Sequence, residues 1–586
     1  MTDHSVLIDK LLRQRGIAPG EATERFLKPD YARDIHDPML LKDAPAASAR
    51  IIKAIESGEK IGIFSDYDCD GIPGAAMFYD LFRRIGYTNF LTYIPHRHNE
   101  GFGLNKAAVD SLADKGVKVL ITIDCGISNR EEVAHANARG MDVIVTDHHE
   151  PPAELPPAMA VIDPKQSDCA YPDKNLCGTG VAFKLIQAVL AQNRFGLKEG
   201  HEKWLLDLVG IATMSDMVPL VGENRVFAHY GMQVLRKSPR KGLRRLLSML
   251  KINQEHLTED DLAFMITPRI NAASRMGVPM DAFDLLTADT DEDANARAKH
   301  LDAINNERKG IVAALVKEVK KTIRERHPEG GASIPSVIVL GNPEWRPSLL
   351  GLAANSCAEE FRRPVFLWGK DGVGIFKGSC RSEGTSNVVE IMRAAPAGTF
   401  GEFGGHKHSG GFGVIAESIH HLEQRLNDAA AKLAADAAAI AAGNAPRADG
   451  DIGEEPEYED EEIETDEEQE EPTPEEITLD DVDTGLYETV NQLAPFGVGN
   501  RKPNFILKSV SPVSVRAFGK TNDHVELVFN RQRGPKLNAI AFFGATEDWA
   551  QQVKPGQKID LIANIEKSMF RNRPEIRLRV VDVVYS

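Results

Sequence analysis

The segment Lys60 to Gly71, KIGIFSDYDCDG, is the stretch around which the chain is organised. Its apolar run, residues 61–64, is followed by a polar turn and then by apolar residues at helical spacing. That order predicts a buried parallel strand whose C-terminal end leads into a helix. Doubly wound α/β folds bind their ligands at such strand ends. We therefore expect a doubly wound parallel sheet with its functional site at this turn.

Three aspartates, Asp66, Asp68 and Asp70, occupy alternate positions directly after the apolar run. The pattern D-x-D-x-D-G matches the start of an EF-hand calcium loop, but the twelfth position, which needs a bidentate carboxylate, is Met77 here. An EF-hand loop also follows a helix, not a strand. Carboxylates this close repel one another, so a fold that gathers them is expected to hold a cation. For this segment alone, a solvated acidic turn is the alternative.

Three further apolar segments carry polar residues of the same kind at their ends. VKVLITID ends at Asp124, MDVIVTDHH ends at His148 and His149, and LLDLVGIATMSDMVPL carries Asp216. Because the ends of parallel strands lie side by side along one edge of a sheet, we expect these residues to converge on one site. The alternative for the two histidines is a capping or core role.

The expected ligands are carboxylates with one or two imidazoles and no thiolate. Such a set suits Mg²⁺ or Mn²⁺ better than structural zinc, and it is large enough for two ions. Two ions about 4 Å apart are the usual arrangement for attack of water on a phosphodiester. The pattern therefore predicts two divalent metal ions and phosphodiester hydrolysis.

Size and charge limit the possible classes of protein. A chain of 586 residues is too long for one core, and its composition is that of an ordinary globular protein. Residues 449–483 hold twenty Asp and Glu and no Lys or Arg, so the formal charge of −18 is confined to one block and the rest carries about +2. A basic cluster within 236–245 could face phosphates or form a solvated helix face.

Targeting segments and metal-binding cysteines are not expected. The sequence has no signal-peptide pattern and no apolar run long enough to span a bilayer, which predicts a cytoplasmic protein without a membrane partner. The six cysteines form no CxxC pair, so we expect free thiols and no zinc ribbon.

Changes in apolar periodicity divide the chain into six parts. Alternating strand and helix patterns predict two α/β units, and helical spacing predicts a connector with a long helix from about Asp291 to His327. Many short alternating strands at the end predict a small barrel of the OB type. The expected parts are a helical segment at 1–45, α/β at 46–235, the connector at 236–330, α/β at 331–443, a disordered acidic linker at 444–483 and the barrel at 484–586.

The motifs DYDCDG, ITIDCGIS, TDHH and SDMVPL resemble the successive motifs of the DHH phosphoesterase superfamily. Their order and spacing are similar to those of the RecJ single-strand-specific exonucleases within it. The resemblance continues through EGFGLN, GTGVAFKL, PRINAASRMG, KGSCRS, FGGHKHSGGF and LAPFGVGN, and it covers most of residues 45–586. It implies a DHH domain and a DHHA1-like substrate-binding domain joined by the long helix, with an OB-fold at the end.

The resemblance also implies roles for individual residues. The first ion would bind Asp66 and Asp68, the second Asp70, His148 and Asp216, with Asp124 between them and His149 near the scissile phosphate. The expected substrate contacts are Arg269, Asn271 and Arg275 in the connector and Arg381, Ser382, Gly404, Gly405 and His406 in the DHHA1-like domain, where residues 403–406 read as a glycine-rich turn. In the barrel, Phe518 and Phe570 with Arg516, Lys520, Arg571 and Arg573 could stack bases and contact phosphates, or the phenylalanines could be core residues.

The chain departs from the family pattern at a few positions. Pro73 and Gly74 stand where a small hydroxyl residue usually opens the helix, and Arg346 and Pro347 follow Trp345 where His-Glu-Gly is more usual. His408 and Ser409 replace small residues after Gly-Gly-His. Because both ligand sets are complete, we expect hydrolysis with an altered preference for strand end or length.

The sequence thus predicts a monomeric metal-dependent exonuclease on single-stranded DNA. The family implies degradation from the 5′ end to mononucleotides in recombination and repair, with a single-strand-binding protein or a helicase as possible partners. One alternative is hydrolysis of short oligoribonucleotides or cyclic dinucleotides, against which the barrel and the length argue. The other is a non-catalytic DNA-binding scaffold, which would not need mutually repelling carboxylates.

Overall fold

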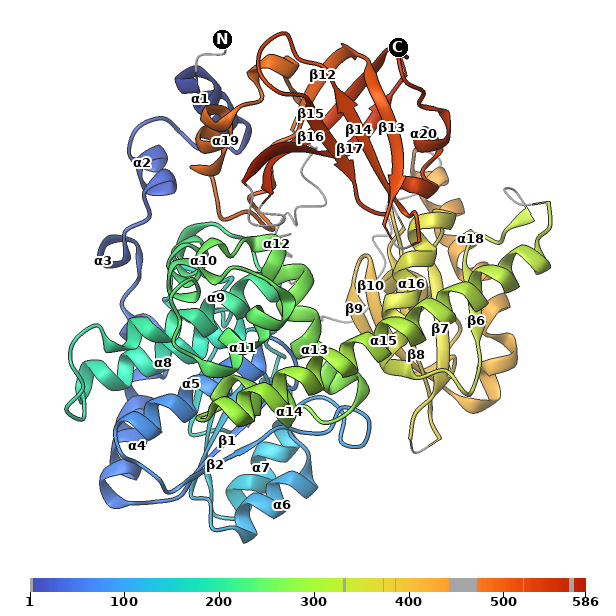
Figure 1. The fold of residues 1–586 in the computed structure, drawn as a ribbon. Helices are drawn as coiled ribbons and strands as arrows, with labels where there is room; N and C mark the ends of the chain where they lie inside the picture. The colour runs from blue at the N-terminus through green and yellow to red at the C-terminus, as the bar shows by residue number, and fades with distance from the viewer. Residues whose placement is uncertain are drawn as a thin grey trace.

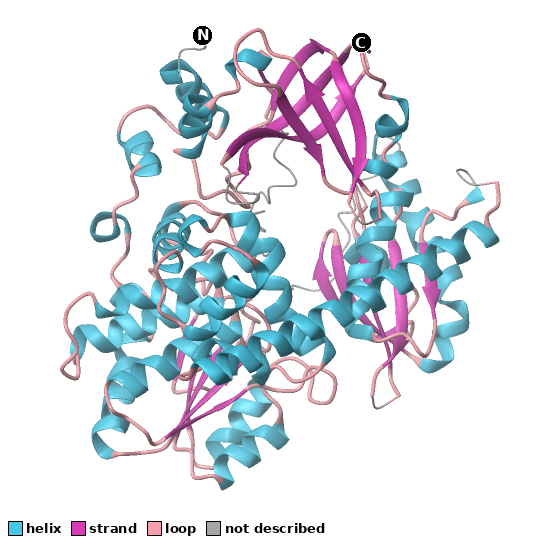
Figure 2. Ribbon diagram, viewed as in Figure 1, coloured by secondary structure: helices cyan, strands magenta, loops and turns pink. Residues whose placement is uncertain are grey.

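The structure is a computed structural model that describes residues 4–329, 333–372, 374–384, 386–441, 472–519, 521–568 and 574–585. Its strands form two five-stranded sheets and one seven-stranded sheet, which belong to three successive parts of the chain (Figures 1 and 2). All six cysteines are free and buried. Among the described residues, no helix has both the length and the apolar character needed to cross a membrane.

The first sheet is parallel throughout, as the apolar runs predicted. Its strand order is β2-β1-β3-β4-β5, and every residue of β1 and β3 is buried. Both faces of a parallel sheet are covered, so the strands are apolar on both sides. The strands are β1 (Ile61–Ser65), β2 (Phe90–Tyr93), β3 (Val119–Ile123), β4 (Asp142–Thr146) and β5 (Ala160–Ile162).

Helices cover both faces of this sheet, which makes it doubly wound. Ile61 and Ile63 of β1 pack in the core on one face, and Phe64 packs in the core on the other. The first face is covered by α4 (Ala44–Ser57), α5 (Gly71–Arg84), α8 (Gly178–Gln192) and α9 (Leu206–Ser215), and the second by α6 (Lys106–Asp114) and α7 (Arg130–Ala138).

The long helix of the connector is α15 (Asp291–Arg326), one residue shorter than predicted. Thr290 caps its first turn, and acidic residues at its start and arginines at its end suit the helix dipole. Its first half contributes Leu301 to the core of the first domain, and its second half contributes Leu315 and Val319 to the core of the next. One continuous helix of 36 residues therefore joins the two α/β units (Figure 1).

Four shorter helices of the connector precede α15, with a π-helical stretch among them. They pack against the first domain and against the start of α15. These elements are α11 (Lys241–Leu250), α12 (Glu259–Asp261), the π-helix η4 (Leu262–Ile266), α13 (Thr267–Met276) and α14 (Met280–Thr287). Helix α10 (Gly222–Leu235) comes before them and packs on α9 of the first domain.

The second α/β domain has the strand order β6-β7-β8-β10-β9, with only β6 and β7 parallel. The prediction of a glycine-rich turn at residues 403–406 is wrong, because these residues lie in β9 and pair with β10. The elements are β6 (Ile338–Gly341), α16 (Pro347–Phe361), β7 (Val365–Lys370), β8 (Phe376–Arg381), α17 (Val388–Ala394), β9 (Phe400–His406), β10 (Ser409–Val414) and α18 (Leu422–Ala441).

The C-terminal domain is a strongly curved seven-stranded sheet, as predicted for an OB-like barrel (Figure 1). Its strand order is β11-β12-β16-β17-β15-β14-β13. Helices α19 (Thr484–Asn491) and α20 (Asp548–Gln552) accompany it. The strands are β11 (Glu475–Glu476), β12 (Phe505–Val510), β13 (Pro512–Phe518), β14 (His524–Phe529), β15 (Leu537–Ala541), β16 (Ile559–Ser568) and β17 (Glu575–Val584).

The C-terminal domain begins earlier than the sequence predicted. Residues 475–483 were assigned to the acidic linker, but β11 pairs with β12, and Ile477 and Val482 are buried in the core of this domain. The earlier part of the linker, residues 444–471, lies outside the described residues, as do Lys520, Phe570, Arg571 and Arg573 of the predicted strand contacts.

The N-terminal segment packs against the C-terminal domain and then returns to the first domain. Helix α1 (His4–Gln14) buries Leu7, Leu11 and Leu12 in the core of the C-terminal domain. The Gln14 amide donates to Oε1 of Glu475 at 2.6 Å. Helices α2 (Glu21–Leu27) and α3 (Tyr31–Asp34) then lead back to the first domain (Figure 1).

Candidate metal centre

The three aspartates after β1 lie in a tight loop that leads directly into α5. Asp68 accepts hydrogen bonds from the backbone N–H groups of Asp70 at 2.8 Å and Gly71 at 3.2 Å, so its carboxylate supports the start of the helix. A Cβ at Gly71 would lie 2.4 Å from the carbonyl oxygen of Asp66, so only glycine fits there. The start of α5 is therefore held without the hydroxyl residue that Pro73 replaces.

The buried carboxylate of Asp70 is held by the first turn of α8. Its two oxygens accept from the N–H groups of Gly178 at 2.6 Å and Thr179 at 2.8 Å. Helix N-termini present unpaired N–H groups and a partial positive charge, so this one stabilises the carboxylate. The GTG start of α8 thus positions an aspartate more than a hundred residues earlier in the chain.

Asp124 follows β3 directly and has a left-handed backbone conformation, with φ of 59°. Its N–H donates to the carbonyl of Thr146 at 3.0 Å, which ties the end of β3 to the end of β4. Gly178 lies so close that a Cβ there would be 2.6 Å from both Cβ and Oδ1 of Asp124. The carboxylate is therefore fixed between the sheet and α8.

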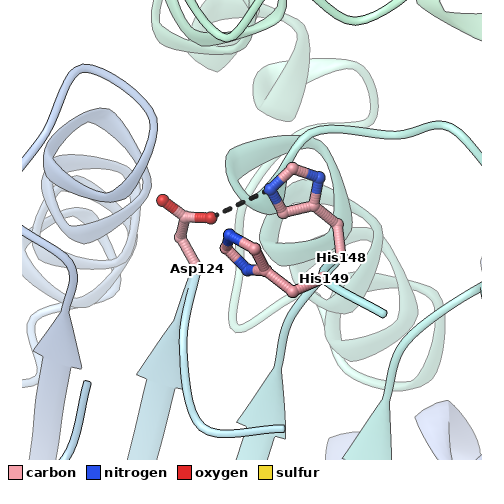
Figure 3. Close-up of side chains that lie close together, drawn as sticks. All are labelled: Asp124, His148 and His149. Carbon is pink, nitrogen blue, oxygen red and sulfur yellow. Dashed lines mark ion pairs between the residues drawn. The ribbon is translucent and has the colours of Figure 1, made fainter. Parts of the chain in front are cut away.

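The two histidines after β4 turn toward Asp124 (Figure 3). Nε2 of His148 lies 3.2 Å from Oδ1 of Asp124 and 3.7 Å from Oδ2 of both Asp70 and Asp216. The His149 ring lies beside it, with ring centroids 4.6 Å apart. His148 is thus the point at which the ends of β1, β3 and β4 and the end of α9 meet.

Asp147 has a supporting role that the sequence did not reveal, although it stands directly before the histidine pair. Its Oδ1 lies 2.7 Å from Nδ1 of His149 and also accepts from the backbone N–H groups of both histidines. Its Oδ2 accepts from the N–H of Ile127 at 2.9 Å. Asp147 therefore orients the histidines and does not join the carboxylates around His148.

The ligand atoms fall into three groups, in each of which all of them lie within 4.8 Å of one another. Oδ1 of Asp66 and Oδ1 of Asp124 are buried and accept no hydrogen bond from the described residues, which suits atoms that bind a cation. The donors are oxygen and imidazole nitrogen, as Mn²⁺ and Mg²⁺ prefer. The groups are Asp66, Asp68 and Asp124; Asp70, His148 and Asp216; and Asp124, His148 and His149.

The electrostatics of these groups also suit a cation. Burial, followed by repulsion from neighbouring aspartates, raises the pKa of Asp66, Asp124 and Asp216 well above the ordinary range and that of Asp70 to about 6. Burial and then the charge of His149 lower the pKa of His148 to about 3, so its imidazole is neutral and has a lone pair free for a metal. A bound cation would reverse the shifts of the aspartates.

The connector residues predicted to contact substrate have different surroundings. The side-chain oxygen of Asn271 accepts from the N–H of Cys69 at 2.8 Å, so α13 touches the aspartate loop. Arg269 is buried and directs Nε and Nη2 at Oδ1 of Asp302, at 2.9 and 2.7 Å, and Nη1 at a backbone carbonyl. These contacts place Arg269 in the packing of α13 on α15.

Arg275 belongs to a group of arginines between the first and second α/β domains. Its Nη1 donates to the carbonyl of Ser348 at 2.9 Å, across from α13 to α16. Burial, and then the charges of Arg97 and Arg308, lower its pKa to about 10, and Arg381 adds to this repulsion. Arginines that repel one another suit a polyanionic ligand. Arg97 and Arg308 were not predicted, because neither lies in a motif that marks it.

The remaining predicted contacts lie at one edge of the second α/β domain. Ser382 donates through Oγ to the carbonyl of Ser386 at 2.7 Å, and its N–H donates to the carbonyl of His408 at 3.0 Å. Gly404, Gly405 and His406 are exposed on β9, the edge strand of the sheet. This edge offers backbone and small side chains to a ligand.

Three family models match successive parts of the chain. They are the DHH family N-terminal domain over residues 60–213, the DHHA1 domain over 335–433 and the RecJ OB domain over 475–582. The chain is also 32% identical over 582 residues to the single-stranded-DNA-specific exonuclease RecJ of Bacillus subtilis, covering 99% of this chain and 68% of that protein. The chain belongs to the RecJ family.

Other RecJ proteins agree with this assignment. RecJ of Haemophilus influenzae is 33% identical over 434 residues, which are 72% of this chain and 74% of that protein. A crystal structure of exonuclease RecJ bound to manganese is 32% identical, with a TM-score of 0.57 over 67% of this chain and 95% of that one. RecJ of Thermus thermophilus in complex with Mn²⁺ shares the fold, with a TM-score of 0.73 at 24% identity over 99% of this chain and 78% of that one.

Proposed function

We propose that the chain is a metal-dependent exonuclease that hydrolyses single-stranded DNA from the 5′ end and releases 5′-mononucleotides. The observation that carries this proposal is that two carboxylate-rich ligand groups meet where His148 of one lies against Asp124 of the other, beside an arginine group. RecJ relatives named for single-stranded-DNA-specific exonuclease activity, and RecJ structures that hold Mn²⁺ or Mg²⁺, support it.

Two divalent ions, Mn²⁺ or Mg²⁺, would bind two neighbouring groups of ligands. The groups touch where His148 of one lies beside Asp124 of the other. Bound there, such ions polarise a phosphodiester and lower the pKa of an attacking water. Asp66, Asp68 and Asp124 would hold one ion, and Asp70, His148 and Asp216 the other.

His149 is suited to donate to the phosphate that reacts. Burial lowers the pKa of His149, but its hydrogen bond to Asp147 and the charge of that carboxylate outweigh burial and raise the pKa above the ordinary value. The raised pKa favours the protonated form of the ring, which lies beside His148 and close to Asp124. In this position it would stabilise negative charge on a non-bridging oxygen in the transition state.

The arginine group would hold the phosphates next to the scissile bond. Arg97, Arg275 and Arg381 lie where α13, α16 and β8 come together, and their mutual repulsion is relieved by an anion. Ser382 and the exposed β9 edge would contact the sugar-phosphate backbone beyond them. A channel between two lobes that accepts one strand and excludes duplex would explain selectivity for single strands.

An aromatic surface continues this proposed path onto the C-terminal domain. Phe543 is 69% exposed and packs edge-on against His524, with ring centroids 4.7 Å apart. The Arg579 guanidinium lies 5.5 Å from the Phe542 ring and 5.9 Å from the ring of Phe264 in η4, so the surface spans two domains. Exposed rings with arginine over them are typical of single-strand binding by base stacking.

We also propose the finer biological setting. The chain acts as a monomer in the cytoplasm, in recombination and repair, and a single-strand-binding protein or a helicase supplies its substrate. Single-stranded ends of the chromosome arise when a duplex is opened, and an enzyme that cannot open a duplex depends on such a partner.

One digestion tests the proposed reaction. Single-stranded DNA labelled at the 5′ or at the 3′ end is incubated with Mn²⁺ or Mg²⁺, and the products are separated by length. We expect immediate release of the 5′ label as a mononucleotide and late release of the 3′ label. Early release of the 3′ label would overturn the polarity, and faster cleavage of a diribonucleotide or cyclic dinucleotide would favour that substrate class. No hydrolysis together with undiminished DNA binding would favour a scaffold.

A further inference from the structure

A cavity lies where the N-terminal segment, the first domain and the C-terminal domain meet. Its volume is about 450 Å³, and its walls come from residues 15–36, from the start of α10 and from Gly499. None of the candidate metal ligands and no member of the arginine group lines it. It is therefore a site separate from the proposed nuclease centre.

Arg225 in the wall of this cavity carries a buried charge. It is 3% exposed, and its guanidinium carbon lies 3.5 Å from the centroid of the Phe26 ring. Nε donates to the carbonyl of Phe26 at 2.8 Å and Nη2 to that of Leu493 at 3.1 Å, whereas Nη1 finds no acceptor in the described part of the chain. A buried cation without a paired anion is costly, so the wall at Arg225 favours an anionic ligand in the cavity.

Arg15 adds a second charge of the same kind. It donates to Oδ1 of Asn500 at 2.9 Å and to backbone carbonyls, and no described carboxylate lies within ion-pair distance of it or of Arg225. Burial lowers the pKa of Arg15 to about 10, and burial followed by repulsion from Arg15 lowers that of Arg225 to about 9. An anion between the two would relieve both effects.

The other charges at the cavity are already balanced. Arg25 pairs with Glu21 at 2.8 Å, and Arg33 pairs with Asp34 at 2.7 Å. The carboxylate of Glu223 pairs with the buried Lys184 at 2.8 Å. At the start of α10 the N–H of Glu223 donates to Oδ2 of Asp173 at 3.0 Å, so this carboxylate offsets the partial positive charge of the helix. The unbalanced potential in the cavity is therefore positive.

Most of the remaining wall is apolar. Ile17, Ala18, Ala22, Phe26, Pro29 and Val226 line it, and Ala18 and Ala22 are exposed at its rim, so a ligand can enter. Binding sites of about 300–1,000 Å³ with apolar walls and a few fixed charges take small organic ligands. A volume of about 450 Å³ suits one nucleotide and is too small for a strand.

We propose that this cavity binds a nucleoside monophosphate, with the phosphate at Arg15 and Arg225 and the base against the apolar wall. The choice of a nucleotide rests on the proposed function, because this is the product that the reaction releases, whereas the need for an anion rests on the two arginines alone. The ligand would connect the N-terminal segment to both domains that it touches.

Calorimetry with 2′-deoxyadenosine 5′-monophosphate in EDTA tests the proposal on the full chain, because no metal and no catalysis are needed. The variant Ala22→Trp fills the cavity from its exposed rim, and Glu24→Trp on the same helix, outside the cavity wall, is the matched control. We expect the first to weaken binding at least tenfold and the second to leave it within twofold. Deoxyadenosine, which lacks the phosphate, should bind at least tenfold more weakly.

Three results would overturn the proposal. They are no binding to the unaltered chain, equal affinity of the Ala22→Trp variant, and equal affinity for deoxyadenosine. The variant Arg275→Ala separates the two sites, since binding that disappears there and survives in Ala22→Trp belongs to the nuclease centre. A chain that binds the nucleotide in the cavity but digests no DNA would refute the proposed function and leave this site standing.

Discussion

Replacing Gly178 by alanine tests whether the metal centre depends on the close contact between α8 and Asp124. The new Cβ would lie 2.6 Å from both Cβ and Oδ1 of Asp124, whereas nonbonded carbon atoms settle at about 3.5–4.0 Å. Asp124 and the start of α8 must therefore separate by about 1 Å. That movement also disturbs the hydrogen bond from the Gly178 N–H to Asp70.

We expect two consequences of this displacement. A misplacement of about 1 Å at a reacting centre lowers the rate roughly 100-fold. Overpacking of a buried site costs about 1–3 kcal/mol of folding free energy. The Gly178→Ala variant should thus fold, lose roughly two orders of magnitude in kcat/KM on 5′-labelled single strands, and bind Mn²⁺ more weakly by calorimetry.

Gly180→Ala is the matched control on the same helix. The nearest atom to its new Cβ would be Cβ of Leu176 at 3.5 Å, an ordinary contact, and alanine favours a helix over glycine by about 1 kcal/mol. This variant should keep kcat/KM within about twofold and raise the urea midpoint. If Gly178→Ala had the kcat/KM and Mn²⁺ affinity of the control, the contact would not position Asp124 and the reasoning would be refuted.

Three further predictions concern single buried charges. Asp124→Asn removes a carboxylate that its neighbours repel, so without metal the variant should have a higher urea midpoint than the unaltered chain. Adding Mn²⁺ should raise the midpoint of the unaltered chain more than that of the variant. An equal rise in both would contradict a role of Asp124 in metal binding. Burial raises the pKa of Asp163 to about 7. The stability that this carboxyl group contributes is therefore present at about pH 4 and is lost as the pH rises through 7. In the Asp163→Asn variant the urea midpoint should fall less steeply between about pH 5 and 8, and an unchanged dependence of the midpoint on pH would refute this. Lys184→Met leaves Glu223 buried without its ammonium partner and should cost about 3–5 kcal/mol in urea unfolding, with a cost below about 1 kcal/mol counting against the pair.

The convergence of the candidate metal ligands was predictable because most of them stand at the ends of apolar strands. β1 and β3 are buried throughout and parallel, so Asp66 and Asp124 had to emerge at one edge of the sheet. The same geometry brings His148 to that edge from β4. Local sequence thus encodes both the strand and the position of the polar residue that follows it.

Other parts of the site could not be read in this way. Arg97 comes from a loop and Arg308 from the middle of α15, and only the packing of two domains brings them to Arg275. Gly404 and Gly405 suggested a turn by composition, but pairing with β10 holds them in an edge strand. These placements depend on contacts between residues far apart in the chain, which local patterns do not contain.

The position of α1 has a consequence for how the protein is made. Leu7, Leu11 and Leu12 are synthesised long before the strands that cover them, such as β12 and β16. Until those strands are made, the helix lacks the core that buries these leucines. A chain truncated before β12 would therefore expose an apolar helix face, which chaperones and proteases recognise.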